Sequence, residues 1–250
     1  MNIKTSVKLI SRRLANLLFP RGCASCGSIS FKGRFYTLCP DCAKSITFTT
    51  GGRCLQCGEI LGTNNMPNIA LCPKCADMNI AYKRVLCTTA YNGSIINLIH
   101  ALKYKNAPYI AKDLAQLALL HPETETFLRD AILVAVPLSF TRKLKRGYNQ
   151  SEEIVREITK RAPHLNIKTA KLLKRTKQTS TQTRLGRNER MKNVAKAFTH
   201  TPQCNTIDKN QKIVIVDDVI TTASTINECA KILKKCGFKN IFAFSIAKRM

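Results

Sequence analysis

Hydrophobic residues in the last two thirds of the chain form two patterns that alternate. Short runs that are largely apolar predict buried strands at 84–91, 131–136, 213–216 and 241–246. Between these runs, apolar residues three or four positions apart predict amphipathic helices at 94–104, 108–120, 224–236 and from about Asn149 onward, where Glu152 is placed for a capping box. Strands that alternate with helices predict an α/β fold built on a parallel sheet.

Three segments lie outside this alternation. An N-terminal helix is predicted within residues 1–20, because positions 3–18 have apolar residues at helical spacing and Pro20 follows them. This helix either packs on the rest of the protein or lies on a membrane surface. The basic stretch after Pro137 predicts a loop, and residues 174–193, with few apolar side chains, predict a long exposed arm.

Eight of the twelve cysteines form four Cys-x-x-Cys pairs in the first 75 residues, and the pairs repeat their surroundings. The first and third pairs share the pattern Cys-x-x-Cys-Gly, whereas the second and fourth share Leu-Cys-Pro-x-Cys-Ala. The first pattern recurs after 31 residues and the second after 33, so a whole unit is duplicated. Its cysteines are Cys23, Cys26, Cys39 and Cys42 in the first copy, and Cys54, Cys57, Cys72 and Cys75 in the second.

Four thiolates at this spacing can occupy the corners of a tetrahedron, the geometry of structural zinc. The repeat suggests one ion for each copy of the unit, while an interleaved pairing of the cysteines stays open. A disulfide framework is the competing interpretation, but Arg12 and Arg13 interrupt the only early apolar stretch that could act as a signal peptide. Thiol-disulfide catalysis by one pair would not explain four pairs in register. We therefore expect a double zinc ribbon over residues 21–80, with two structural zinc sites, and a second domain over 84–250.

The charge of the chain is strongly positive. The 250 residues carry a formal net charge of +26, and residues 140–200 contain 17 Lys or Arg against 4 Asp or Glu. Such a surplus favours nucleic acid, anionic lipid or phosphorylated small molecules, without choosing among them; a basic surface with no such partner is the alternative. No apolar run approaches the roughly 20 residues of a membrane-spanning helix. We expect a cytoplasmic protein, with association with the inner face of the membrane as a variant.

The most specific chemical signal follows the predicted strand at 213–216. Asp217 and Asp218 come directly after the strand, and a segment rich in hydroxyl groups then leads into the next helix. Ligands of open α/β sheets bind at the carboxyl ends of strands, and N–H groups at a helix start favour phosphate. The two carboxylates can accept hydrogen bonds from vicinal hydroxyls or help to hold Mg²⁺ through water. A ribose 5-phosphate site fits this order; a buried strand before an N-capped helix would explain the hydroxyls but not both aspartates.

This arrangement resembles the signature of the type I phosphoribosyltransferases, with its acidic pair and phosphate loop. The resemblance implies that Asp217 and Asp218 hold the ribose hydroxyls and act as the catalytic acidic pair. It assigns the 5-phosphate to Thr221, Thr222, Ala223, Ser224 and Thr225. The family usually has glycine at the position of Ala223. If this position needs a positive φ, alanine costs on the order of 1 kcal/mol.

Further segments resemble the ComF family of competence-associated, phosphoribosyltransferase-like proteins, which includes the GntX-type DNA-utilisation proteins. The sequence Val-Pro-Leu-Ser at 136–139 and the Arg-Gly-Tyr-Asn-Gln-Ser block at 146–151 are similar to its central motif, and Leu-Phe-Pro at 18–20 is similar to its opening. Similarity continues through residues 91–104 and 178–198 and thus covers the chain in order. It implies a double zinc ribbon ahead of a phosphoribosyltransferase-type sheet with helices on both faces.

The same resemblance implies further site residues and partners. Pyrophosphate would lie near Pro137, Leu138, Ser139 and Arg142, with Arg175 and Lys177 from the arm at 174–193, which would close over the donor. The implied ligand is a phosphoribosyl pyrophosphate-type molecule with Mg²⁺. The implied role is DNA uptake and utilisation in natural transformation, acting on single-stranded DNA beside the uptake machinery or a helicase or recombination protein.

Two kinds of function follow from these features. In the first, the fold serves a protein that binds single-stranded DNA through its zinc ribbons and the basic segment at 140–200, with Tyr104, Tyr148 and Phe198 as candidate stacking groups. In the second, the protein is an active phosphoribosyltransferase that acts on a nucleobase or another small acceptor. The sequence shows no pocket for such an acceptor, so enzymatic activity is left open and the DNA-handling role comes first.

Overall fold

The chain is described by a computed structural model that covers residues 22–29, 32–61, 71–76, 78–176 and 197–249. The helix expected over residues 3–18 lies outside this part. Five parallel strands form the central sheet in the order β1-β7-β6-β2-β3. They are β1 (Val85–Ala90), β7 (Asn240–Lys248), β6 (Lys212–Ile220), β2 (Ile132–Ala135) and β3 (Lys168–Thr169). The predicted α/β fold with a parallel sheet is confirmed.

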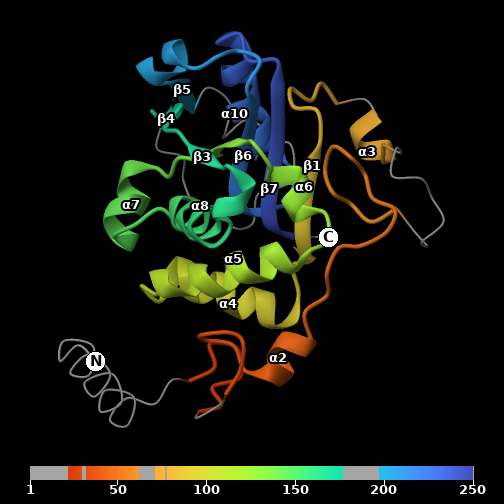
Figure 1. Cartoon of the computed structure of the whole chain (residues 1–250), viewed down its shortest axis with the longest axis vertical. Helices are drawn as coiled ribbons and strands as arrows, with labels where there is room; N and C mark the ends of the chain where they lie inside the picture. Colours follow the sequence, from red (N-terminus) through yellow and green to blue (C-terminus); the bar gives the residue numbers. More distant parts are fainter. Residues whose placement is uncertain (1–21, 30–31, 62–70, 77, 177–196, 250) are drawn as a thin grey trace.

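Helices cover both faces of the sheet (Figure 1). Helices α4 (Gly93–Tyr104), α5 (Ala111–Leu120) and α8 (Gln150–Arg161) lie on one face and α10 (Ser224–Lys235) on the other. The alternation of side chains along β6 shows why: Val214 and Val216 belong to the core under the first group, whereas Ile213 and Ile215 belong to the core under α10. A strand that is buried on both faces must be apolar throughout, which is what its sequence shows.

Several short elements complete the domain. The helix expected over 108–120 begins as the 3-10 turn η1 (Pro108–Ile110) before α5, and Asn149 caps α8 by accepting a hydrogen bond from Ser151 N at 3.0 Å. The remaining ones are α6 (Thr124–Leu128), η2 (Pro163–Leu165), η3 (Pro202–Thr206) and the two-stranded antiparallel sheet of β4 (Leu173–Arg175) and β5 (Phe198–His200).

Three expectations from the sequence are corrected. The basic stretch after Pro137 is not a loop, because Phe140–Arg146 forms helix α7. The first residues of the arm expected over 174–193 belong to strand β4, and positions 177–193 lie outside the described residues. Strand β6 does not stop at residue 216; it continues to Ile220, because pairing with β7 extends to Lys248.

The connections of two neighbouring strands run in opposite directions. Strand β2 leads through α7 and α8 to β3 on one side, whereas β6 leads through α10 to β7 on the other. A crevice opens where connections diverge in this way, at the carboxyl ends of the strands. Strand β2 ends at Ala135, opposite Val216, so the last four residues of β6 extend past it. The aspartates of the sequence motif lie in this extension.

The two cysteine-rich units lie at different places on the domain (Figure 1). The first ribbon, residues 22–29 and 32–46 with α2 (Pro40–Lys44), packs against α4 and α5. The second ribbon, residues 51–61, 71–76 and 78 with α3 (Pro73–Ala76), packs against β1, where Val85 N donates to Leu55 O at 2.7 Å. Residues 47–50 join them and run antiparallel along the outer edge of β1.

None of the helices in the described part of the chain combines the length and hydrophobicity that crossing a bilayer requires.

Candidate functional site

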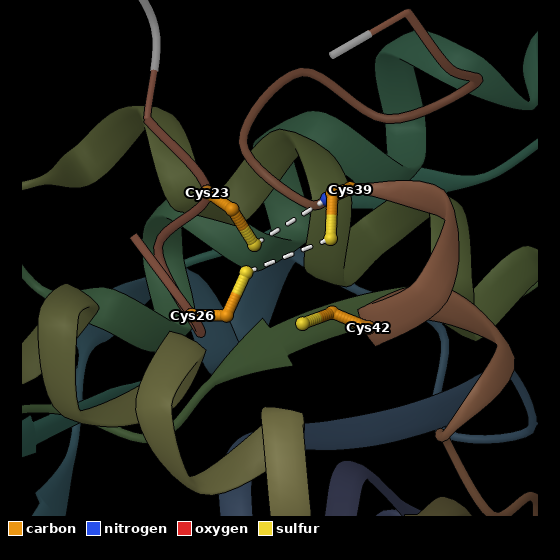
Figure 2. Close-up of side chains that lie close together, drawn as sticks. All are labelled: Cys23, Cys26, Cys39 and Cys42. Carbon is orange, nitrogen blue, oxygen red and sulfur yellow. Dashed lines mark hydrogen bonds between the residues drawn. The ribbon is translucent and has the colours of Figure 1, made fainter. Parts of the chain in front are cut away.

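The eight cysteines of the repeat form two separate clusters, one in each ribbon. In each, the four sulfur atoms lie within 4.8 Å of one another, and Figure 2 shows those of the first ribbon turned toward a common centre. Sγ of Cys26 is 3.7 Å from Sγ of Cys39, and Sγ of Cys57 is 3.6 Å from Sγ of Cys72. Tetrahedral zinc with Zn–S bonds of about 2.3 Å separates its sulfurs by about 3.8 Å, whereas a disulfide needs about 2.0 Å. The donor sets fit two structural zinc sites, paired within each repeated unit.

Backbone N–H groups favour the thiolate form at the matching cysteine of each unit. Burial would raise the pKa of Cys23, but hydrogen bonds from backbone N–H groups, Cys39 N among them at 3.4 Å, lower it to about 6. The same balance at Cys54 lowers its pKa to about 7. Zinc binds thiolates, so these N–H groups prepare each site for the metal.

The two zinc sites differ in their access to solvent. In the first ribbon Cys26 is exposed and Cys42 is half-buried, whereas all four cysteines of the second ribbon are buried. The side chains therefore form one site at the surface and one that is closed off by the domain.

The acid pair, Asp217 and Asp218, occupies the part of β6 that extends past β2. Asp217 accepts hydrogen bonds from Ser151 Oγ at 3.1 Å and from Asp218 N at 2.9 Å, while Asp218 accepts from Val219 N at 2.8 Å. Burial and the adjacent charge of Asp218 raise the pKa of Asp217 to about 7. Ser151 begins α8, so the start of that helix contributes to this site.

A lysine from a distant helix pairs with the acid pair. Lys103 lies in the last turn of α4, and its Nζ is 2.8 Å from a carboxylate oxygen of Asp218, with both side chains largely buried. Burial alone would lower the pKa of Lys103, but the charge and hydrogen bond of Asp218 raise it. No local sequence pattern indicates this partner, because 115 positions separate the two residues.

The hydroxyl loop, residues 221–225, follows the acid pair and leads into α10. Oγ1 of Thr222 and Oγ of Ser224 lie 2.9 Å apart. Ala223 is buried, precedes the first turn of α10 and has φ of 58° and ψ of 2°. A non-glycine residue in this left-handed region costs about 1–2 kcal/mol. The position therefore has the positive φ at which alanine is more costly than glycine, and Ala223 adopts it.

A basic cavity of about 380 Å³ adjoins the acid pair through Lys103. Four of its seven lining residues are cationic: Lys103, Arg142, Lys145 and Arg146. The others are Tyr104, Asn106 and Tyr148. The guanidinium of Arg146 lies 5.2 Å from the ring centre of Tyr104, which holds both groups at the mouth of the cavity.

The residues expected near pyrophosphate are partly brought together. Pro137 and Leu138 follow β2, and buried Ser139 precedes α7. Burial, and then the charge of Arg142, lower the pKa of Arg175, and Asp217 acts on it in the opposite direction. Arg142 and Arg175 thus share one electrostatic environment with the acid pair. Lys177 lies outside the described residues.

The aromatic residues considered for stacking differ in exposure. Phe198 is buried, and Tyr148 is half-buried with its hydroxyl donating to Leu102 O, whereas Tyr104 is 58% exposed. Phe140, on α7, is 69% exposed, and the sequence did not indicate it, because the basic stretch around it predicts a loop. Two exposed rings therefore lie on helices that line the basic cavity, Tyr104 on α4 and Phe140 on α7.

Known families match both parts of the chain. The double zinc ribbon domain matches residues 14–76, and the phosphoribosyl transferase domain matches residues 107–250. These matches confirm the phosphoribosyltransferase-like sheet preceded by a double zinc ribbon.

Curated relatives resemble the chain over most of its length. Competence protein F of Haemophilus influenzae is 29% identical over 222 residues, which cover 84% of this chain and 90% of that protein. DNA utilization protein YhgH of Escherichia coli strain K12 is 32% identical, covering 80% and 85%, and Competence protein ComFC of Streptococcus pneumoniae is 26% identical, covering 84% and 87%. The chain therefore belongs to the ComF family and joins a double zinc ribbon to a phosphoribosyl transferase domain.

Proposed function

We propose that this protein acts in DNA uptake and utilisation during natural transformation, and that it binds single-stranded DNA and a phosphoribosyl pyrophosphate-type ligand. The names of its relatives, competence protein and DNA utilization protein, support the role. The observation that carries the proposal is the Lys103–Asp218 ion pair, because it joins a basic cavity to the acid pair at one end of the sheet.

The acid pair and the hydroxyl loop suit the sugar phosphate. The carboxylates of Asp217 and Asp218 accept hydrogen bonds from vicinal ribose hydroxyls, and Ser151 holds Asp217 in place. Backbone N–H groups and hydroxyls of residues 221–225 hold the 5-phosphate, where the start of α10 also favours an anion. Carboxylates are hard oxygen ligands, so this pair suits Mg²⁺, which would neutralise part of the pyrophosphate charge.

The pyrophosphate is assigned to the side of the acid pair opposite the 5-phosphate. Arg142 and Arg175 lie close enough to interact electrostatically, because burial and then the charge of Arg142 lower the pKa of Arg175. A bidentate phosphate contact suits two neighbouring guanidinium groups, because it brings negative charge to both of them. Pro137, Leu138 and Ser139 supply the backbone at the end of β2 beside which the anion lies. Lys177 stays a prediction for this role.

Helix α7 suits single-stranded DNA. It carries Arg142, Lys143, Lys145 and Arg146 but no acidic residue, and none of its residues is buried. Phe140 and Leu144 are 69% and 68% exposed, one turn apart. Cations beside an exposed aromatic ring match the alternating phosphates and bases of a single strand. The exposed ring of Tyr104 and the basic cavity continue this surface toward the acid pair.

An active phosphoribosyltransferase is the second candidate, and the same arginines favour it. In that reaction the bond between C1′ and pyrophosphate breaks, the pyrophosphate leaves with the bonding electrons, and an acceptor forms the new bond to C1′. Arg142 and Arg175, which lie close enough to affect each other, would stabilise the departing charge. The acceptor would be a nucleobase or another small nucleophile.

The proposed setting is the cytoplasm, where incoming single strands meet the uptake machinery and helicase or recombination proteins. Association with the inner face of the membrane would use the same basic surface. Competition between anionic vesicles and a single-stranded oligonucleotide distinguishes these uses, because a shared surface gives mutually exclusive binding.

Calorimetric titration of 5-phosphoribosyl 1-pyrophosphate with Mg²⁺ into the zinc-loaded protein tests the ligand. Saturable binding is expected in wild type and its loss in a variant that combines Asp217→Ala and Asp218→Ala. The same variant should bind single-stranded DNA as well as wild type or more tightly, because Lys103 loses its carboxylate partner. Loss of both kinds of binding in a folded variant would contradict separate sites.

Salt dependence tests the DNA surface. Binding to single strands weakens with salt by about 0.7 logarithmic units per phosphate contact for each tenfold rise in salt. Changing Lys143 and Lys145 to alanine should reduce this slope by about 1.4, whereas the same change at Lys234 and Lys235, exposed on α10, should leave it unaltered. DNA affinity that does not change between low and high salt would contradict the role of α7.

A further inference from the structure

A buried lysine at the end of β7 holds the first backbone carbonyl of the hydroxyl loop. Nζ of Lys248 donates to Thr221 O at 3.0 Å and to Arg249 O at 2.7 Å. Its third contact is with a carboxylate oxygen of Glu59, at 3.1 Å. An ammonium group has three donors, and all three are used here, with the side chain only 3% exposed. Lys248 therefore fixes where the loop leaves β6.

Glu59 belongs to the second ribbon. It follows Cys57 and Gly58, and its backbone O accepts a hydrogen bond from Cys54 N at 2.8 Å. Gly58 lies close against β1, because a Cβ at this position would be 2.8 Å from Sγ of Cys87. The first Cys-x-x-Cys pair of the second zinc site is thus connected to Thr221 through one carboxylate and one lysine.

A separate connection reaches the other end of the loop. Asn227, buried in the first turn of α10, accepts a hydrogen bond from Ala81 N at 2.7 Å and donates to Asn79 O at 3.0 Å. Residues 79–81 leave the second ribbon just after Met78, whose N donates to Cys75 O at 3.1 Å. The second Cys-x-x-Cys pair is therefore tied to the helix that the loop enters.

These two connections enclose the strained residue of the loop. Ala223 lies between Thr221 and Asn227 at a positive φ, and strain of this kind persists only where surrounding contacts over-determine the backbone. We infer that Lys248 and Asn227 are positioning residues, through which the second zinc ribbon holds the hydroxyl loop in its strained conformation. The first ribbon contacts α4 and α5 through Ser25, Tyr36 and Thr37 and has no such connection among the described contacts.

Hydrogen exchange of the amides of residues 221–227 in the full-length, zinc-loaded protein tests this inference. Lys248→Met should raise their exchange about tenfold while both zinc ions stay bound, and Asn227→Ala should raise it at the α10 end. Lys231→Met, on the exposed face of α10, is the matched control and should change nothing. Exchange in Lys248→Met equal to that of wild type would overturn the inference.

A rescue variant separates positioning from general loosening. If the two connections offset the strain at Ala223, then Ala223→Gly added to Lys248→Met should restore most of the lost protection, since glycine accepts a positive φ without strain. A loop that stays unprotected in this double variant would mean that strain at Ala223 is not what the connections hold.

Matched zinc-ligand variants test the origin of the effect. Cys72→Ser and Cys39→Ser occupy equivalent positions of the repeat, and each removes a ligand from one site. Exchange at 221–227 should rise in Cys72→Ser and not in Cys39→Ser; equal effects would overturn the assignment to the second ribbon. If either chain fails to fold, Lys248→Met still decides, because it leaves all eight cysteines in place.

The consequence for the ligand rests on the proposed function. Affinity for 5-phosphoribosyl 1-pyrophosphate with Mg²⁺ should fall about tenfold in Lys248→Met, and Lys248→Arg, which keeps a cation with several donors, should recover part of it. Absence of binding in wild type would refute the proposed ligand, and the exchange experiment would still decide the inference. Unaltered affinity despite raised exchange would refute the link between loop order and ligand.

Discussion

The two ribbons come from one repeated unit and have become different parts of the molecule. The first lies on α4 and α5, keeps Cys26 at the surface and is hydrogen-bonded to Asp113 of α5. The second has all four cysteines buried, packs against β1 and connects to both ends of the hydroxyl loop. The same ligand set therefore builds a peripheral zinc site in one place and, in the other, a zinc site connected to the hydroxyl loop. Surroundings, and not the motif, decide what each zinc stabilises.

The largest effect is expected where the second ribbon meets the domain. Arg53 is buried and forms an ion pair with Glu123, which also pairs with Arg84. Glu123→Gln leaves the buried guanidinium without its carboxylate and should destabilise the protein by about 3–5 kcal/mol in urea unfolding. Arg53→Met removes the buried charge as well and should cost less. An equal or larger loss in Arg53→Met would contradict this account of the pair.

The attachment of the first ribbon gives the next effect. Asp113, buried at the start of α5, accepts hydrogen bonds from Tyr36 N at 2.8 Å, Thr37 N at 2.5 Å and Thr37 Oγ1 at 2.7 Å. Asp113→Ala leaves these donors unpaired and should cost about 2–3 kcal/mol, whereas Thr37→Val removes one of them and should cost about 1 kcal/mol. Exchange at residues 221–227 should not change. A rise there would show that the first ribbon also holds the loop.

Zinc removal should distinguish the ribbons by rate. Cys26 is exposed in the first site, so a chelator can reach that metal without opening the domain, whereas the second site requires local opening. We expect the first site to lose zinc at least about tenfold faster, as judged by mapping which cysteines become alkylated while the metal is released. Earlier alkylation of Cys54 or Cys57 would reverse the comparison.

Relief of the strained residue should have a smaller effect of opposite sign. Ala223→Gly should stabilise the protein by about 1 kcal/mol, since glycine adopts a φ of 58° without the steric cost that alanine has. Ala230→Gly, in the buried interior of α10, is the control and should destabilise it. A loss of stability in Ala223→Gly would show that the loop tolerates alanine for a reason other than its ties to the second ribbon.

The last effect concerns pH at the acid pair. The pKa of Asp217 is raised from 3.8 to about 7 in the folded protein, so the folded state holds a proton that the unfolded state has released. Its contribution therefore lowers the free energy of unfolding as pH rises from about 4 to 7. Urea unfolding of wild type and Asp217→Asn at pH 5 and 8 measures it, since the difference between them cancels the pH dependence of zinc binding. An equal difference in unfolding free energy between wild type and Asp217→Asn at pH 5 and at pH 8 would contradict the raised pKa of Asp217.

What the sequence could predict depends on how local the signal is. The repeat of the cysteine pairs is contained in 53 residues, so it indicated the two zinc sites, and the structure resolved the pairing that had stayed open. The apolar run at 213–216 identified β6, but its end was placed too early, because aspartates are rare in strands. Pairing with β7 overrides that preference up to Ile220.

The parts that escaped prediction rest on contacts between distant segments or on exposed structure. Lys103 reaches Asp218 from 115 positions away, and Glu59 reaches Lys248 from 189, so neither pair leaves a local pattern. Helix α7 buries none of its residues and therefore has no apolar stripe facing a core, which is the feature that identified α5 and α10. The exposed position of Phe140 was not predicted for the same reason.

The segment that joins the ribbons bears on how the duplicated unit could have persisted. Ala90 N donates to Thr47 O at 2.9 Å and Thr49 N donates to Thr88 O at 3.1 Å, so residues 47–50 occupy the backbone groups along the outer edge of β1. An uncovered edge of this kind is a template for self-association into fibrils. In a descendant that lost either ribbon, one end of residues 47–50 would no longer be anchored. Selection against aggregation, independent of any use for zinc or DNA, would then keep both copies in the lineage.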